Sequence, residues 1–162
     1  MRTQTHSAPL IQPAIAWREK LDQPSAPRLV RATDAGSERF RAGSMLVPTP
    51  RLIQEVLRSV PAGQFITMSA LRQKLAEAHA ADYTCPLSTG MFLRIVAEAA
   101  EEASNDPLRA VDAVAWWRCV RDDGQLSERF PGGAEEQARR LLLEGVHVAH
   151  RGNKYMVIPD KA

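Results

Sequence analysis

The sequence predicts a mainly α-helical protein with a small β component: a winged helix-turn-helix-like core of three helices, with short strands and a hairpin. Two observations predict this fold class. Between residues 49 and 103, apolar residues recur at the three- and four-residue spacing that one face of a helix requires. After Pro107 the pattern changes to short runs of strand-forming residues separated by turns that contain glycine.

Three helices are expected in the first of these regions. Thr49 is a suitable N-cap with Pro50 at the first helical position, and Pro61 ends that helix. A second helix is expected from about Ser69 to His79 and a third from about Ser88 to Ala103. Because a tight connection separates the last two, the pair fits a helix-turn-helix. The residues expected to face inward on these two helices are Met68, Leu71, Leu75, Ala78, Met91, Phe92, Ile95, Val96 and Ala99.

The elements after Pro107 are short. The run AVAWWRCV, residues 113–120, is rich in strand-forming residues, and the adjacent Trp116 and Trp117 would then point to opposite faces of a strand. A charged helix is expected in AEEQARRLLLEG, where Gly145 closes it. The ending VHVAHRGNKYMVIP alternates around a turn, which predicts a β-hairpin and a candidate wing.

The chain divides near residue 45. Residues 1–44 mix prolines, charges and small residues, and contain one short helical candidate around Trp17 and Leu21. We expect them to form an extended arm that docks on the domain of residues 45–162, because isolated apolar residues have no use in a solvated tail. The alternative is an arm that folds only on a partner. The apolar residues concerned are Ile15, Trp17, Leu21, Leu29, Val30 and Phe40.

Composition narrows the possible functions. The formal net charge is +2, so any surface that attracts nucleic acid must be local. No apolar run approaches the roughly 18 residues of a membrane helix, and the N-terminus lacks the pattern of a secretion signal, so we expect a cytoplasmic protein with no membrane partner. Cys85 and Cys119 are expected to be free thiols, and His147 and His150 have no metal-binding partner nearby. We therefore expect neither a metal nor a cofactor.

Four motifs, in order, carry a resemblance to a known family. They are VLRSVPAGQFITMSALRQKLA, NDP, VAWWRCVRDDGQL and FPGGAEEQARRLLLEGV. Together they resemble the C-terminal, DNA-binding domain of the O6-alkylguanine-DNA alkyltransferase family. With WREKL, VPTPRL and CPLSTGMF included, the whole sequence is similar to bacterial alkyltransferase-like proteins that lack the active-site cysteine. The resemblance implies a monomer that binds double-stranded DNA.

The same resemblance indicates where the reactive residues of the family fall. With the family arginine on Arg118, Trp117 takes the position of the activating histidine and Trp116 that of the cysteine nucleophile. Indole has no acceptor and no group that titrates near neutral pH, so these residues cannot perform alkyl transfer. Cys119 is three positions late, and on a strand it would point to the opposite face. We therefore expect a protein that is not an enzyme.

Tryptophan at the cysteine position is a property of the alkyltransferase-like proteins, which bind alkylated guanine in DNA and pass the lesion to other repair proteins. The resemblance thus implies damage recognition, with Trp116 lining a pocket for an extruded base. The family tyrosine that rotates the phosphate falls on Met68, and the arginine that replaces the flipped base falls near Gly90. The residues expected to contact DNA or a base are Met68, Ser88, Thr89, Gly90, Arg94, Trp116, Trp117, Arg118 and Arg121.

Two other hypotheses remain. Glu98, Glu101 and Glu102 follow Arg94 on the third helix and would repel phosphates, which favours a pseudoenzyme that binds a protein partner through the arm around Trp17. An enzyme that uses Cys85 as a different nucleophile is the third hypothesis. Glu144 matches the glutamate that orients the histidine of active transferases, and without that histidine we expect a structural residue at a helix end.

Overall fold

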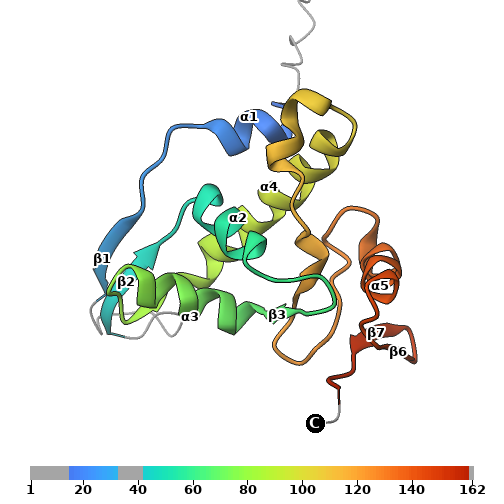
Figure 1. The fold of residues 1–162 in the computed structure, drawn as a ribbon. Helices are drawn as coiled ribbons and strands as arrows, with labels where there is room; N and C mark the ends of the chain where they lie inside the picture. The colour runs from blue at the N-terminus through green and yellow to red at the C-terminus, as the bar shows by residue number, and fades with distance from the viewer. Residues whose placement is uncertain (1–14, 33–41, 161–162) are drawn as a thin grey trace, which may run out of the picture.

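The structure of the protein, a computed structural model, describes residues 15–32 and 42–160. Helices dominate it and the strands are short, which confirms the predicted fold class (Figure 1). Two buried apolar clusters hold it together. The larger lies among the helices of the N-terminal two thirds of the chain, and the smaller lies around the last helix and the last hairpin.

Three helices build the larger cluster: α2 (Pro50–Arg58), α3 (Met68–Ala78) and α4 (Pro86–Ser104). Threonines begin the first two, because the Thr49 and Thr67 hydroxyls accept the backbone N–H groups of Leu52 and Ala70, which have no partner inside the helix. The predicted second helix therefore begins one residue earlier than expected. The predicted third helix begins two residues earlier, with Pro86 in its first turn. The core shared by α2, α3 and α4 includes Ile53, Leu57, Leu71, Leu75, Leu93 and Val96.

The inward faces of α3 and α4 differ from the prediction at two positions. Met91 is 62% exposed and Ala78 is also exposed, although both were expected to face the core. On α4 the buried face follows Thr89, Leu93 and Val96, so it is rotated by about one residue from the expected stripe. This rotation places Met91 in solvent.

The arm contributes a helix and a strand to the folded body. Helix α1 (Trp17–Asp22) lies across α4 (Figure 1), and its Leu21 is 2% exposed inside the larger cluster. The backbone N–H groups of Trp17 and Arg18 donate to the Glu102 carboxylate of α4, at 3.0 and 2.9 Å. At the other end of α1, Asp22 pairs with Arg51 and Arg109. Phe40, which was also predicted to dock, lies outside the described residues.

A three-stranded sheet adjoins the start of α4. Strand β1 (Arg28–Ala32) pairs antiparallel with β2 (Gly43–Val47), which pairs in parallel with β4 (Tyr83–Thr84). Since α4 begins two residues after β4, this sheet holds the N-terminal end of α4. The order of the strands is β1-β2-β4, so β1 is at the edge.

The segment 113–120 is not the long strand that its composition predicts. After a 3₁₀ helix, η1 (Pro107–Asp112), residues Trp116–Arg118 form a second one, η2, and only β5 (Cys119–Val120) is extended, in parallel with β3 (Ile66–Thr67). Backbone bonds cause the turn, because the Trp116 N–H donates to the Val114 carbonyl and the Arg118 N–H to the Ala115 carbonyl. The two indoles therefore do not alternate across a strand.

The C-terminal elements match the prediction more closely. Helix α5 (Gly133–Leu143) is followed by strands β6 (Val148–Arg151) and β7 (Lys154–Val157), which form the predicted antiparallel hairpin. The hairpin packs against α5 in the smaller cluster. In Figure 1 it lies on the opposite side of the molecule from α3. None of the helices in residues 15–32 and 42–160 has the length and apolarity needed to cross a lipid bilayer.

Docking of the arm can be tested by shortening its buried leucine. Leu21→Ala removes a side chain that is 2% exposed and leaves a cavity against α4, so we expect the free energy of unfolding to fall by about 2–5 kcal/mol. Urea denaturation followed by circular dichroism measures it. The matched control is Leu29→Ala in the same arm, where the side chain is 57% exposed, and equal losses in the two variants would contradict docking through Leu21.

Candidate functional site

The two tryptophans lie where the two apolar clusters meet. Trp116 has 0% of its surface exposed, and its ring packs edge-on against Trp117 with 5.9 Å between the centroids. On its other side is Phe130, at 5.2 Å. Trp117 is half-buried and contacts both clusters. This junction joins α4 and η2 to the C-terminal part of the chain.

Trp116 is held by a partly buried polar contact. Its Nε1–H donates to Glu101 of α4 at 2.8 Å, and Arg140 of α5 donates to both oxygens of the same carboxylate at 2.7 and 2.9 Å. The Arg140 guanidinium also lies over both indoles, 5.2 Å from the Trp116 centroid and 4.9 Å from that of Trp117. A tryptophan enclosed in this way is a core residue. The expected base pocket at Trp116 is therefore closed in this structure.

The Arg118 guanidinium, like the Trp116 indole, is held by contacts within the protein. Its Nε and Nη2 donate to the two oxygens of Glu144 at 2.9 and 2.7 Å, and its Nη1 donates to the Val60 carbonyl at 2.7 Å. Trp117 Nε1–H donates to Glu144 at 3.1 Å. Burial raises the pKa of Glu144, but the hydrogen bonds from Arg118, Trp117 and Gly63 outweigh it and hold the pKa below its ordinary value. The predicted structural role of Glu144 is confirmed.

The two cysteines are both enclosed. Cys119 is completely buried, and burial raises the pKa of its thiol to about 12, so it stays protonated at neutral pH. Its thiol lies 3.4 Å from the thioether of Met68, the half-buried first residue of α3. Cys85 is buried immediately before α4, where its sulfur accepts the Ser88 hydroxyl at 3.3 Å. Neither thiol is open to solvent.

The predicted contacts on α4 divide into buried and exposed residues. Thr89 is fully buried and its hydroxyl donates to the Cys85 carbonyl at 2.7 Å, so its assignment as a DNA-contacting residue is corrected. Ser88 is half-buried. Gly90 and Arg94 are exposed, and a Cβ added at Gly90 would meet no atom within 4 Å.

The exposed Arg94 lies beside a different tryptophan, Trp17. The Arg94 guanidinium is 5.4 Å from the centroid of Trp17 and 3.8 Å from Glu98. Arg121 is exposed in the turn after β5. The predicted set therefore does not form one site: Trp116 and Thr89 are core, Trp117 and Arg118 stabilise the junction, and only part of the set faces solvent.

The acidic residues of α4 do not behave as the sequence suggested. Glu101 is bound by Trp116 and Arg140, and Glu102 accepts the first two N–H groups of α1. Glu98 is half-buried beside Arg94. The carboxylates are thus confined to the second half of the helix, and residues 86–97 contain none.

Sequence reasoning missed two residues that build the junction. Arg140 connects Glu101 to both indoles, and Gln137 is fully buried with its amide donating to the Trp117 and Cys119 carbonyls at 3.1 and 2.8 Å. A signal existed for Gln137, because it lies in the same helical stripe as Ala134, Ala138 and Leu141. No cluster that could hold a metal ion occurs within the part of the chain that the structure describes.

Comparison with known protein families, with curated proteins and with solved structures finds no match to this chain. The likeness to the alkyltransferase-like proteins therefore stays a prediction from the motifs.

The structural role of Trp116 can be tested by truncation. Trp116→Ala leaves a large cavity and removes the indole donor to Glu101, so we expect the free energy of unfolding to fall by about 3–5 kcal/mol in urea denaturation. Trp116→Phe keeps most of the apolar volume and serves as the comparison, with a smaller expected loss. Alanine that lowers stability by less than about 1 kcal/mol, the range of a surface position, would indicate an open pocket instead.

The arginine pair on α5 predicts an acid-sensitive contribution to stability. Hydrogen bonds from Arg139 and Arg140 lower the pKa of Glu136 from its ordinary 4.5 to about 2. The stabilisation is therefore complete above pH 4.5 and is lost as the pH falls toward 2. We expect Glu136→Gln to flatten the fall in unfolding free energy across that range, measured by urea denaturation at several pH values. The exposed neighbour provides the control, because Glu135→Gln should leave the slope unchanged.

Proposed function

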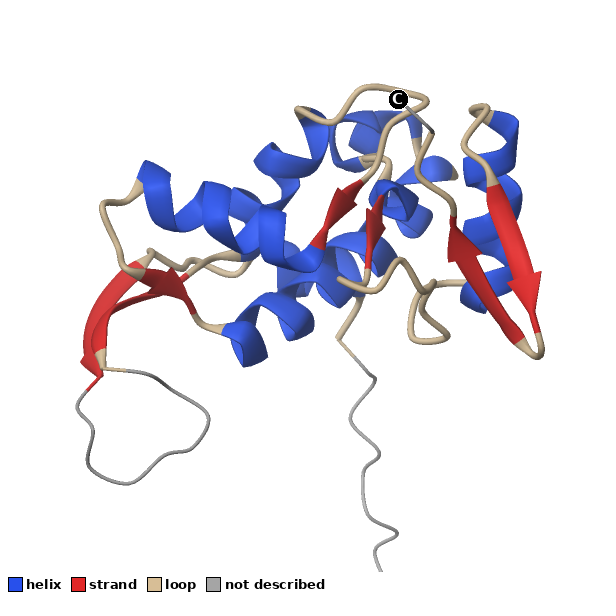
Figure 2. Ribbon diagram, turned by 90° about the horizontal axis from the view of Figure 1, so that it is seen from below, coloured by secondary structure: helices blue, strands red, loops and turns tan. Residues whose placement is uncertain are grey.

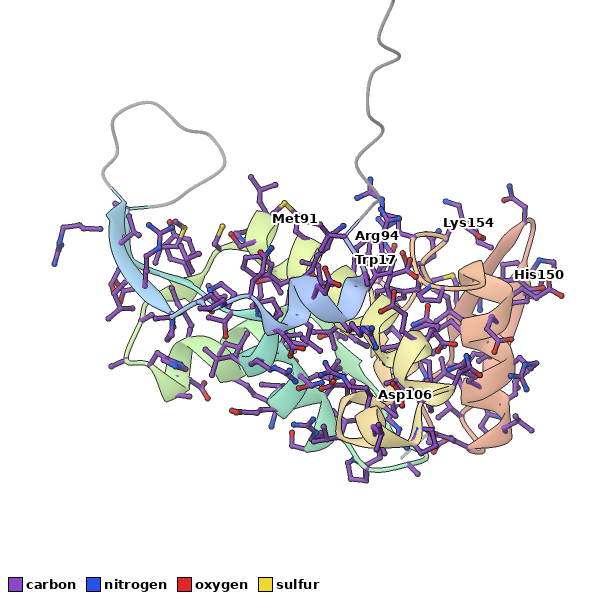
Figure 3. All side chains as sticks on the ribbon, turned by 90° about the horizontal axis from the view of Figure 1, so that it is seen from above. Trp17, Met91, Arg94, Asp106, His150 and Lys154 are labelled. Atoms are coloured by element: carbon purple, nitrogen blue, oxygen red, sulfur yellow. The ribbon has the colours of Figure 1, made fainter. Side chains whose placement is uncertain are left out.

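We propose that the protein binds double-stranded DNA and catalyses no reaction on it. The observation that carries the proposal is an exposed stripe on the first half of α4, here called the α4 stripe, formed by Leu87, Gly90, Met91 and Arg94. These residues are spaced so that they share one face of the helix. Figure 3 shows Met91 and Arg94 on the same side of the molecule.

The chemistry of the α4 stripe suits a DNA groove. Apolar side chains such as Leu87 and Met91 can contact base edges and sugars, and Gly90 allows the helix backbone to approach closely. The stripe begins at the positive end of the helix dipole, and no side chain caps the helix there. In the first turn Leu87 and Ser88 carry the backbone N–H groups that we propose for a phosphate oxygen, since Pro86 has none.

The contacts of two of the three carboxylates on α4 weaken the main objection to DNA binding, while Glu98, the third, pairs with Arg94. Glu101 and Glu102 are engaged by α5 and α1, so they are not directed at a ligand on the first half of α4. The same contacts weigh against a protein-binding role for the arm around Trp17. Its Leu21 is already buried against the body of this chain.

A non-catalytic role is supported by the enclosed thiols. The pKa of Cys119 is about 12 and Cys85 is buried, so neither is suited to nucleophilic attack. The closed environment of Trp116 offers no surface on which an extruded base could stack. We therefore propose binding to the duplex itself, and selectivity for O6-alkylguanine requires Trp116 to leave the core.

The proposal is tested by fluorescence-anisotropy titration of a labelled duplex over a range of salt concentrations. We expect salt-dependent binding that is equal for guanine and O6-methylguanine. Arg94→Gln should lower the slope of log K against log salt by about 1, because one phosphate contact is lost. Arg139→Gln is a matched control: its side chain is 58% exposed against 54% for Arg94, and both arginines pair with a glutamate on their own helix.

Two outcomes would contradict the proposal. One is the absence of any salt-dependent binding by the wild-type protein at low ionic strength. The other is an equal effect of the two arginine substitutions, because bulk charge rather than the α4 stripe would then explain the binding.

A further inference from the structure

Two antiparallel strand pairs, the β1–β2 and β6–β7 hairpins, flank the α4 stripe on one side of the molecule. Figure 2 shows them at opposite ends, with the outer ends of their strands directed to the same side. The view from above agrees, because Met91, Arg94, Lys154 and His150 follow one edge in Figure 3, and β1 reaches that edge at its far end. The helix therefore lies between two projecting hairpins.

Each hairpin carries two exposed cationic residues. Arg28 and Arg31 are on the edge strand β1, where their separation of three residues places them on opposite faces, and Arg151 and Lys154 are opposite each other at the turn of β6 and β7. Within residues 15–32 and 42–160, none of the four has a hydrogen bond or an ion pair to another side chain. A cation that has no internal partner is free to bind an external anion.

The tip of the β6–β7 hairpin is braced by an aromatic pair. His150 and Tyr155 are directly opposite in the register, and their rings stack with 4.4 Å between centroids and 21° between planes. Cross-strand pairs of this kind stabilise a two-stranded ribbon that is otherwise marginal. Arg151 and Lys154, one residue nearer the turn, are thus held on an ordered support.

We propose that these hairpins bind the phosphate backbones of a DNA duplex on either side of the α4 stripe. The β1–β2 hairpin contributes Arg28 and Arg31, which reach its exposed edge from the two faces of the edge strand β1, and the β6–β7 hairpin contributes Arg151 and Lys154. The inference rests on the proposed function and adds two backbone contacts outside the groove. Duplex DNA is the occupant that fits, because it presents two rows of phosphates beside a groove that admits a helix. A single acidic segment would not explain two separated pairs of cations with an apolar stripe between them.

The test compares two double variants with a charge-matched control. Arg28→Gln with Arg31→Gln, and Arg151→Gln with Lys154→Gln, each lower the net charge by two. Lys74→Glu does the same on α3, which lies on the opposite side of the molecule in Figure 3. We expect each hairpin variant to lower the salt slope of duplex binding by up to about two and to weaken binding by about tenfold or more at 0.1 M salt. Lys74→Glu should change neither as much.

Hydroxyl-radical footprinting gives a second test. In the wild-type complex we expect the DNA backbone to be protected on both sides of the central site. In each hairpin variant we expect the protection on one of the two sides to be lost. Thermal unfolding verifies that the variants remain folded, as exposed substitutions should.

Failure of this inference differs from failure of the proposed function. Salt-dependent duplex binding with unchanged slopes in both hairpin variants and a single central footprint would overturn the hairpin contacts and leave the α4 stripe intact. Absence of duplex binding by the wild-type protein would overturn both. Equally tight binding to polyglutamate would also count against both, because it would indicate a surface for an acidic protein.

Discussion

One carboxylate, that of Glu101, fixes how the two halves of the protein meet. It accepts the indole N–H of Trp116 and both terminal nitrogens of Arg140, so a single side chain of α4 holds η2 and α5 together. A partly buried carboxylate is costly unless its oxygens are hydrogen-bonded, and here three N–H donors bind them. The guanidinium of Arg140 also lies over the rings of both Trp116 and Trp117. This contact joins α4, η2 and α5.

The two halves of α4 therefore have different roles. Its second half is structural, since Glu101 binds α5 and Glu102 caps the arm helix. Its first half is held at its N-terminal end by the strand β4 and buries Thr89 and Leu93 on one face, while the α4 stripe on the opposite face is exposed. A helix that is packed on one face and open on the other can present side chains to a ligand without disturbing the core. This is the physical basis for placing recognition at the first half of α4 and not at the tryptophans.

The sequence was informative where local rules decide the structure. Thr49, Pro50 and the apolar spacing of residues 50–103 identified the helices, and the alternation around Gly152 identified the last hairpin. The strand predicted at 113–120 was wrong, because its strand-forming residues adopt a 3₁₀ turn. There the tertiary contact of Trp116 with Glu101 outweighs the local strand propensity. Packing also explains why Met91 is exposed and Thr89 is buried, contrary to the prediction. The elements that pack against α4 decide which of its faces points to the core. The partner of a charged residue such as Glu101 lies 39 positions away and leaves no local signal.

Gly90 gives the protein an adjustable position at the centre of its exposed helix face. A side chain at this residue would meet no neighbouring atom within 4 Å, and the backbone is helical there, so larger residues fit without strain. Replacing glycine inside a helix also reduces the conformational freedom of the unfolded chain, which favours folding. Both native thiols are buried. An engineered cysteine at position 90 is therefore a suitable attachment point for a thiol-reactive fluorophore or spin label. Substitutions at this position can also change the surface that α4 presents while the fold stays the same.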